Sequence, residues 1–174
     1  MVQLNQKRVM DLKRIIISLM LIMLLGITVA SAEITRGEDQ FTGGRTINSV
    51  TSTPNPAELE GLVFRKFANT APAEYELWAN RVTAKSFLFS NTFIELRIDG
   101  IPTKEVAIKK NGLISLSDGK QYSHITVPLS IEIIEQIKSA KRIALKFPTV
   151  NGAYVYVLPE SVLAEWKEVI ATEK

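Results

Sequence analysis

The stretch from Arg142 to Ile170 constrains the fold more than any other part of the chain. It reads as two strands around a tight turn, followed at once by an amphipathic helix. Asn151-Gly152 is a residue pair that tolerates the positive φ angles of a two-residue hairpin turn, and alternating apolar residues flank it on both sides. This stretch therefore predicts a β-hairpin whose second strand leads directly into a helix.

The number of residues in the hairpin loop decides where its aromatic side chains point. An even loop, with Val150 opposite Ala153 and Phe147 opposite Tyr156, puts Tyr154 and Tyr156 on the core face. An odd loop with a glycine bulge puts both tyrosines on the other face, where they would form a contact surface. The Asn-Gly pair favours the even loop, and both alternatives remain open at this point.

The first 32 residues have the order of an export signal. Four basic residues precede the apolar run Ile15–Val29, and the small residues Ala30-Ser31-Ala32 follow it. The run has 15 residues, whereas a helix that crosses a bilayer needs roughly 20. We therefore expect a signal peptide over residues 1–32, with cleavage after Ala32. The protein would then be periplasmic, elsewhere in the cell envelope or extracellular, without a lasting membrane span.

Removing this leader would leave a chain without net charge. The whole chain has 21 Lys and Arg and 18 Asp and Glu. The leader holds four of the basic residues and one of the acidic residues, so 17 of each remain. Proteins that bind nucleic acid present clustered positive charge to the phosphates. We therefore expect no nucleic-acid partner.

The chain contains no cysteine. This excludes disulfides, thiolate nucleophiles and cysteine-ligated metals. It also removes the residue that would carry a lipid after cleavage of a signal peptide. The sequence has no other cluster typical of metal ligands and no phosphate-binding glycine loop, so we expect neither a metal nor a cofactor.

The composition changes near Leu59. Residues 33–58 are poor in large apolar side chains and rich in Gly, Thr, Ser and Asn, which is typical of a mobile polar tail. Within this tail, Arg45–Val50 is the one stretch that can still form a strand at a sheet edge. Residues 59–174 are predicted to form a single mainly-β domain that ends in a helix.

Alternation of apolar and polar residues is clearest in Phe93–Asp99. A strand of this kind has one wet face, which is typical of antiparallel sheets. Turns are predicted at Asp99-Gly100, Asn111-Gly112 and Asp118-Gly119. The predicted strands are Leu62–Phe67, Tyr75–Val82, Ser86–Phe89, Phe93–Asp99, Glu105–Ile108, Leu113–Leu116 and Tyr122–Leu129.

Two short helices are predicted in the last third of the chain. Ser130 is a candidate cap for the first helix, and Pro159 suits the start of the second. Together with the strands they predict an α+β fold: a mainly antiparallel β-sheet or β-sandwich with two short helices near the C-terminus. The apolar stripes are Ile133, Ile134, Ile137 and Ala140 on the first helix, and Val162, Leu163, Trp166, Val169 and Ile170 on the second.

His124 is the only histidine, so an acid–base mechanism at neutral pH would begin there. Alternation places it with Tyr122 and Thr126 on the more polar face of its strand, and the chain has no Gly-x-Ser-x-Gly nucleophile motif. Paired carboxylates are the other route to hydrolysis, but acids on a solvated strand face show the same pattern. No catalytic residue is assigned. The candidate carboxylates are Glu74, Glu76, Glu95 and Asp99.

Aromatic residues are the first candidates for recognition, because Tyr and Trp give large contact areas at a small entropy cost. Many such residues belong instead to a core. We expect a small exported, non-enzymatic binding protein with a protein or glycan partner outside the cytoplasm. The alternative is a small extracytoplasmic hydrolase that uses carboxylates or His124. The candidate binding residues are Tyr154, Tyr156, Tyr75 and Trp78.

Overall fold

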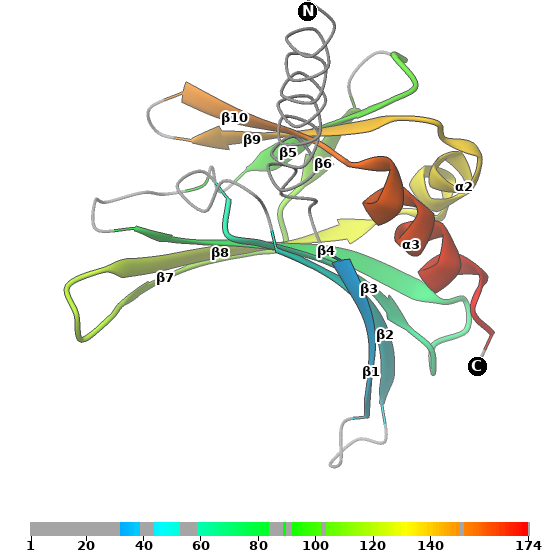
Figure 1. Cartoon of the computed structure of the whole chain (residues 1–174), viewed down its shortest axis with the longest axis horizontal. Helices are drawn as coiled ribbons and strands as arrows, with labels where there is room; N and C mark the ends of the chain where they lie inside the picture. The colour runs from blue at the N-terminus through cyan, green and yellow to red at the C-terminus, as the bar shows by residue number, and fades with distance from the viewer. Residues whose placement is uncertain are drawn as a thin grey trace, which may run out of the picture.

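The structure is a computed structural model that describes residues 32–38, 44–52, 59–83, 89, 92–101, 104–149 and 152–173. Two antiparallel sheets pack face to face, and two helices lie at one end of the molecule (Figure 1). The predicted fold class is confirmed: the described residues are mainly antiparallel β-sheet with two short helices, the second near the C-terminus. The predicted leader lies outside the described residues except for Ala32.

The larger sheet, sheet A, has six strands in the order β1-β2-β3-β4-β8-β7. All neighbouring pairs are antiparallel. The strands are β1 (Ala32–Glu38), β2 (Arg45–Ser52), β3 (Gly61–Phe67), β4 (Glu74–Thr83), β7 (Lys110–Ser115) and β8 (Gln121–Leu129).

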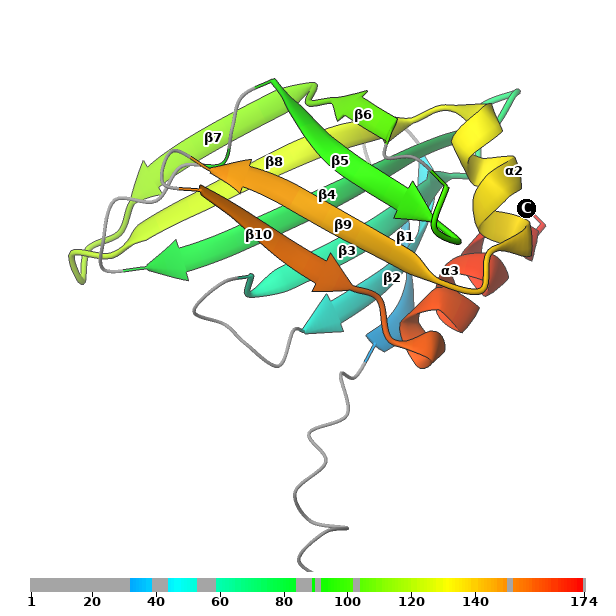
Figure 2. The same ribbon diagram turned by 90° about the horizontal axis from the view of Figure 1, so that it is seen from above.

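The smaller sheet, sheet B, has four strands in the order β10-β9-β5-β6. Its strands cross those of sheet A when the molecule is seen from above (Figure 2). The strands are β5 (Phe93–Ile98), β6 (Lys104–Ala107), β9 (Ile143–Thr149) and β10 (Gly152–Val157), and the helices are α2 (Ile131–Ser139) and α3 (Glu160–Ala171).

The core lies between the two sheets and under α3. Alternate residues of each strand point into it, as the period of two requires. Helix α3 contacts β1, β2 and β3, beside the part of sheet A that sheet B covers (Figure 2). Trp166 is 1% exposed and its ring stacks on that of Phe64, with centroids 4.6 Å apart. Both predicted helix stripes are buried, so the predicted orientation of the helices is confirmed.

The segment expected to be a mobile tail contributes β1 and β2, so that expectation is wrong for both stretches. Arg45–Val50 does form a strand, but β1 pairs along its other side and removes it from the sheet edge. Ser49 and Thr51 point inward and are buried. Burial of Ser49 is tolerated because its hydroxyl donates to the Glu165 carboxylate of α3 at 3.2 Å. That partner comes from a distant part of the chain, so local composition did not reveal it.

Strands β9 and β10 form the predicted hairpin with even parity. Thr149 pairs with Gly152 and Phe147 pairs with Tyr154, so the predicted pair of Phe147 with Tyr156 is wrong by two positions. Gly152 belongs to the ladder with a φ of 136°, and its carbonyl accepts a hydrogen bond from the Thr149 hydroxyl. Asn151 lies outside the described residues. A shift of two keeps the faces unchanged, and both tyrosines therefore lie on the core face.

The turn predicted at Asn111-Gly112 is also wrong, because both residues lie inside β7. Gly100 and Gly119 have the positive φ values expected of the other two turns, 77° and 80°. Gly112 instead lies opposite His124 in the ladder with β8. Of the predicted strand Ser86–Phe89, only Phe89 is described, and it forms an isolated bridge with Thr149.

Candidate functional site

The face of sheet A that points away from sheet B is called the outer face here. None of the described helices or strands packs against it (Figure 1). Trp78 on β4 and Tyr122 and His124 on β8 point to this face, because their neighbours Leu77, Ala79, Ser123 and Ile125 are buried in the core. Strand alternation therefore brings three rings from two neighbouring strands to one uncovered surface.

These three rings form a contiguous cluster, the aromatic trio. The centroids of Tyr122 and His124 are 5.4 Å apart, and each lies 6.3 Å from that of Trp78. All three side chains are partly exposed. Ring pairs at these distances attract one another and order their side chains before a ligand arrives.

Two glycines make room for side chains of the neighbouring strands to lie against the backbone: Gly112 for His124, and Gly61 for Asn80. A Cβ atom on Gly112 would come within 2.2 Å of His124 Cε1, and one on Gly61 within 2.4 Å of Asn80 Oδ1. The imidazole therefore lies directly over the Gly112 backbone, and the Asn80 amide lies over Gly61. A glycine inside a strand often marks such a close approach.

Two adjoining hollows run along the outer face beside the trio, and together they are called the outer groove. The first, about 290 Å³ in volume, is lined by Trp78, His124 and charged side chains. The second, about 550 Å³, is mainly apolar and reaches the start of α2. The hollows share Glu76 and Lys109. The remaining lining residues are Arg65, Lys110 and Thr126 in the first hollow, and Phe67, Pro72, Ala73, Glu74, Tyr75, Pro128, Leu129 and Ile131 in the second.

A fixed ion pair lies at the centre of the outer groove. Arg65 Nη1 is 2.9 Å from Glu76 Oε1, and Arg65 Nε donates to Asn48 Oδ1 at 2.9 Å. In the described part of the chain, the side chains of Lys109 and Lys110 form no ion pair. The groove therefore offers positive charge to a partner beside a pair that is already neutralised.

His124 shares the first hollow with Glu76, but no hydrogen bond joins it to a described carboxylate. Its Nδ1 is buried and has no hydrogen-bond partner among the described residues. A histidine that acts as general base is normally oriented through its second nitrogen by a carboxylate or carbonyl. The geometry here is that of a ring packed on a glycine.

The four candidate carboxylates do not converge on one site. Glu74 and Glu76 lie on the outer face of sheet A, whereas Glu95 lies on the far side of sheet B, paired with Lys146. Asp99 Oδ1 accepts the backbone N–H groups of Lys141 and Arg142, at 2.8 and 2.7 Å, and so holds the chain after α2. Across the residues that can be described, no group of three metal-ligating side chains is suited to hold a metal ion.

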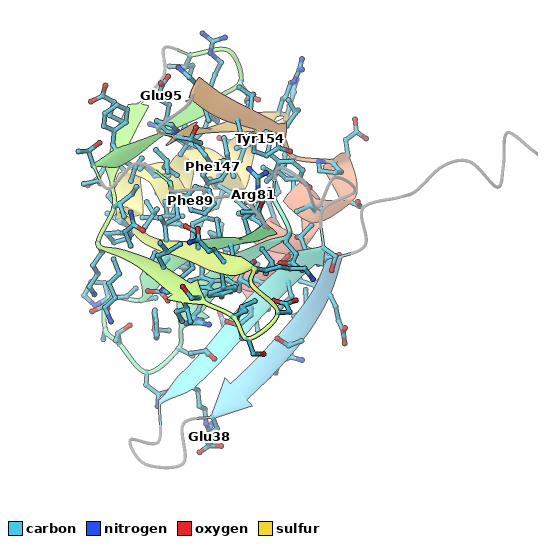
Figure 3. All side chains as sticks on the ribbon, turned by 90° about the vertical axis from the view of Figure 1, so that its left-hand side faces the viewer. Glu38, Arg81, Phe89, Glu95, Phe147 and Tyr154 are labelled. Carbon is cyan, nitrogen blue, oxygen red and sulfur yellow. The ribbon has the colours of Figure 1, made fainter. Side chains whose placement is uncertain are left out.

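The structure separates the four candidate aromatics. Tyr75 and Tyr156 are 8% and 6% exposed and belong to the core. Tyr154 is partly buried and stacks on Phe147, with centroids 6.4 Å apart, in a group with Phe89 between the sheets (Figure 3). Trp78 alone lies on the outer face.

Sequence reasoning missed the other members of the trio as recognition residues. Tyr122 and His124 lie two positions apart on one strand, which already places them on one face. A glycine inside a strand can indicate that a side chain of the neighbouring strand lies over its backbone, as His124 lies over Gly112. The preceding Asn111 made Gly112 resemble part of a turn. Arg65 and Lys109 join the site only through strand pairing, which leaves no local signal.

No described helix is long and apolar enough to span a membrane. The chain matches no family model, and a search of curated proteins finds no match in sequence. Any function must therefore be argued from the surfaces themselves.

Proposed function

We propose that this protein is an exported, non-enzymatic binding protein that holds a partner protein in its outer groove. The observation that carries the proposal is the aromatic trio beside the groove, on a sheet face that no described element covers. Trp, Tyr and Arg are the residue types that contribute most to protein–protein binding energy. Trp78, Tyr122 and Arg65 bring all three types to this face.

The lining of the groove favours a protein partner over a glycan. Phe67, Pro128 and Ile131 form an aliphatic and aromatic hollow, which suits an apolar side chain. Next to it, Lys109 and the Arg65–Glu76 pair can bind carboxylate and backbone groups of an extended segment. A sugar chain has few apolar groups with which to fill the second hollow.

The place of β1 in the sequence is compatible with cleavage of the leader. Strand β1 begins at Ala32, and its ladder with β2 continues to Glu38. Cleavage after Ala32 would remove one residue from that ladder and leave the remainder paired. The neutral balance of charges after Ala32 and the absence of cysteine are compatible with a protein that works outside the cytoplasm without a disulfide or lipid anchor.

The test compares two variants of the protein expressed in the cells that make it. Trp78→Ala removes the indole ring of the trio, and Val155→Ala changes a side chain on the outer side of sheet B that is 53% exposed. After formaldehyde cross-linking, wild type and Val155→Ala should capture the same protein, and Trp78→Ala should lose it. Equal capture by all three would contradict the proposal. Loss of retention on envelope polysaccharide by Trp78→Ala alone would identify a glycan ligand instead.

A hydrolase remains the second candidate because His124 and Glu76 line the same hollow. His124→Phe separates the two functions, since a phenyl ring keeps the packing over Gly112 but cannot transfer a proton. A binding protein should retain its partner in this variant. Loss of a hydrolytic activity in His124→Phe and in Glu76→Gln, with the melting temperature unchanged, would establish the enzyme.

A further inference from the structure

The β7 edge of sheet A exposes large apolar side chains on both of its faces. Leu113, Ile114 and Leu116 are 43%, 53% and 38% exposed. Strand β7 ends the sheet, and in the described part of the chain its only ladder is the one with β8. A long, uncharged and exposed edge strand is a template for pairing with another chain.

The free hydrogen-bonding groups of β7 follow from its ladder with β8. The Leu116 N–H donates to Lys120 O, and these residues lie in the same register as Ile114 with Tyr122 and Gly112 with His124. Hydrogen bonds in an antiparallel ladder alternate along the strand, so the N–H and C=O groups of Gly112, Ile114 and Leu116 face β8. The N–H and C=O groups of Asn111, Leu113 and Ser115 therefore point to the free edge.

The other edges of the two sheets are less suited to pairing. Edge strands β1 and β6 carry charged side chains, including Glu33, Arg36, Lys104 and Glu105, which disfavour edge pairing. Strand β10 lies above sheet A, whose strands continue past it (Figure 2), so a second molecule cannot approach freely. The β7–β8 hairpin extends beyond the end of sheet B in both views (Figures 1 and 2).

We propose that two copies of this protein pair through β7, antiparallel, about a two-fold axis at Leu113. Leu113 then lies opposite Leu113 of the other copy, and Asn111 lies opposite Ser115. Every free N–H and C=O of these three residues finds a partner across the axis. The pairing is isologous, as in most dimers of identical chains.

A second copy fits this edge because two antiparallel copies of the strand match in hydrogen bonding and bring no like charges together. The stretch from Asn111 to Leu116 has no charged residue. In the antiparallel register, Lys110 lies opposite Leu116 of the other copy, so the two Lys110 side chains stand at opposite ends of the ladder. The exposed leucines and isoleucines of the two copies would then cover one another. The dimer would also join both outer faces into one continuous surface, independently of what the groove binds.

The absence of native cysteine allows a direct test of the register. Residues opposite each other in a hydrogen-bonded antiparallel pair have Cα atoms about 5.5 Å apart, within the roughly 4.4 to 6.8 Å of a disulfide. Leu113→Cys should therefore oxidise to a covalent dimer. Ile101→Cys, at a loop residue 52% exposed, should remain monomeric under the same conditions. Equal cross-linking of the two variants would overturn the proposed register.

Sedimentation equilibrium of the purified protein tests the association without a cross-link. Wild type and Ile101→Lys should show the mass of a dimer as concentration increases, and Leu113→Lys should remain monomeric. Circular dichroism confirms that each variant is folded. A wild type that stays monomeric at all concentrations, or a Leu113→Lys variant that still forms dimers, would refute pairing through β7.

Discussion

At Gly112 the identity of one residue determines the shape of the outer face. The imidazole of His124 occupies the space that any side chain at position 112 would need. The ring also contacts Tyr122 and Trp78, so moving it would disturb the whole trio. Gly112 therefore couples the backbone of β7 to the candidate site.

Gly112→Ala should destabilise the protein by roughly 1 to 3 kcal/mol, because the new methyl group forces the His124 ring away from its site. In a His124→Ala background the same change should cost much less, since the obstructing ring is gone. Urea denaturation of the two single variants and the double variant measures this coupling. Additive losses would show that the ring and the glycine are independent.

Glu165 is a residue whose charge opposes burial. Burial raises the pKa of its carboxyl, and the hydrogen bond from the Ser49 hydroxyl partly offsets this effect. The folded protein therefore keeps the proton at pH values where the unfolded chain has lost it. The contribution to stability is fully present below the unfolded pKa, near 4.3, and decreases as the pH rises through the higher folded value.

Glu165→Gln should therefore stabilise the protein at pH 7 relative to wild type, with little effect near pH 3.5. Glutamine is neutral at both pH values and can still accept the Ser49 hydrogen bond. Chemical denaturation at the two pH values gives the difference. Glu105→Gln, at an exposed position of β6, is the control and should show no comparable gain at neutral pH. A gain in Glu165→Gln that does not depend on pH would point to packing instead of ionisation.

Among the elements, α3 packs the last part of the described chain against its first strands. Its apolar stripe covers the inner side of β1–β3. At its C-terminus, Lys66 Nζ donates to the carbonyls of Ile170 and Thr172, at 2.9 and 2.7 Å. These bonds satisfy backbone acceptors that a helix end leaves without intrahelical partners. Strand β3 therefore holds both the buried face and the end of α3.

Trp166→Ala should be among the most damaging substitutions, with a loss of roughly 3 to 5 kcal/mol from the cavity left against Phe64. Trp166→Phe should cost less, because a ring remains to stack on Phe64. The change also removes the indole N–H, which is buried without a hydrogen-bond partner among the described residues. Glu168→Ala, on the exposed side of α3, serves as the control. Thermal melts rank the three variants. Equal melting temperatures for Trp166→Ala and Glu168→Ala would contradict the packing of α3.

At the scale of the whole molecule, the two faces of sheet A differ in what covers them. The inner face of sheet A is covered by sheet B and α3. Its outer face combines rings, an ion pair and two lysines that form no ion pair with a described residue. The first described strand begins at Ala32, the residue after which the sequence predicts cleavage. With the leader removed, the molecule would be a compact sandwich that presents one broad face to its surroundings.

The exported protein should begin at Glu33, because the small residues Ala30-Ser31-Ala32 follow the apolar run as in a cleavage site. Intact-mass analysis of protein recovered from the envelope or the medium measures the N-terminus. The same measurement on protein retained in the cytoplasm is the control and should give the full chain. A recovered exported form that still includes Ile15–Val29 would indicate a membrane-tethered protein.

The sequence by itself determined the features that depend on near neighbours in the chain. Alternation placed Ile94, Leu96 and Ile98 on one face of a strand, and helical spacing identified the buried side of Trp166, because both periods are local properties of the backbone. It favoured the even hairpin loop that the structure has, although it misplaced the pairing by two residues. The pairing was harder to place because the predicted last pair, Val150 with Ala153, and the observed one, Thr149 with Gly152, both leave two residues between the strands.

Only the tertiary structure decided which faces are covered. Tyr75 and Trp78 lie three residues apart on β4, and alternation puts them on opposite faces, but the position of sheet B made Tyr75 core and left Trp78 exposed. Ser49 resembled a residue of a tail because the helix that carries its partner Glu165 comes more than a hundred positions later. The candidate site also depends on distant parts of the chain. Arg65, Glu76 and His124 lie on three paired strands, β3, β4 and β8, and Lys109 precedes β7. Pairing between distant strands is decided by the packing of the whole core.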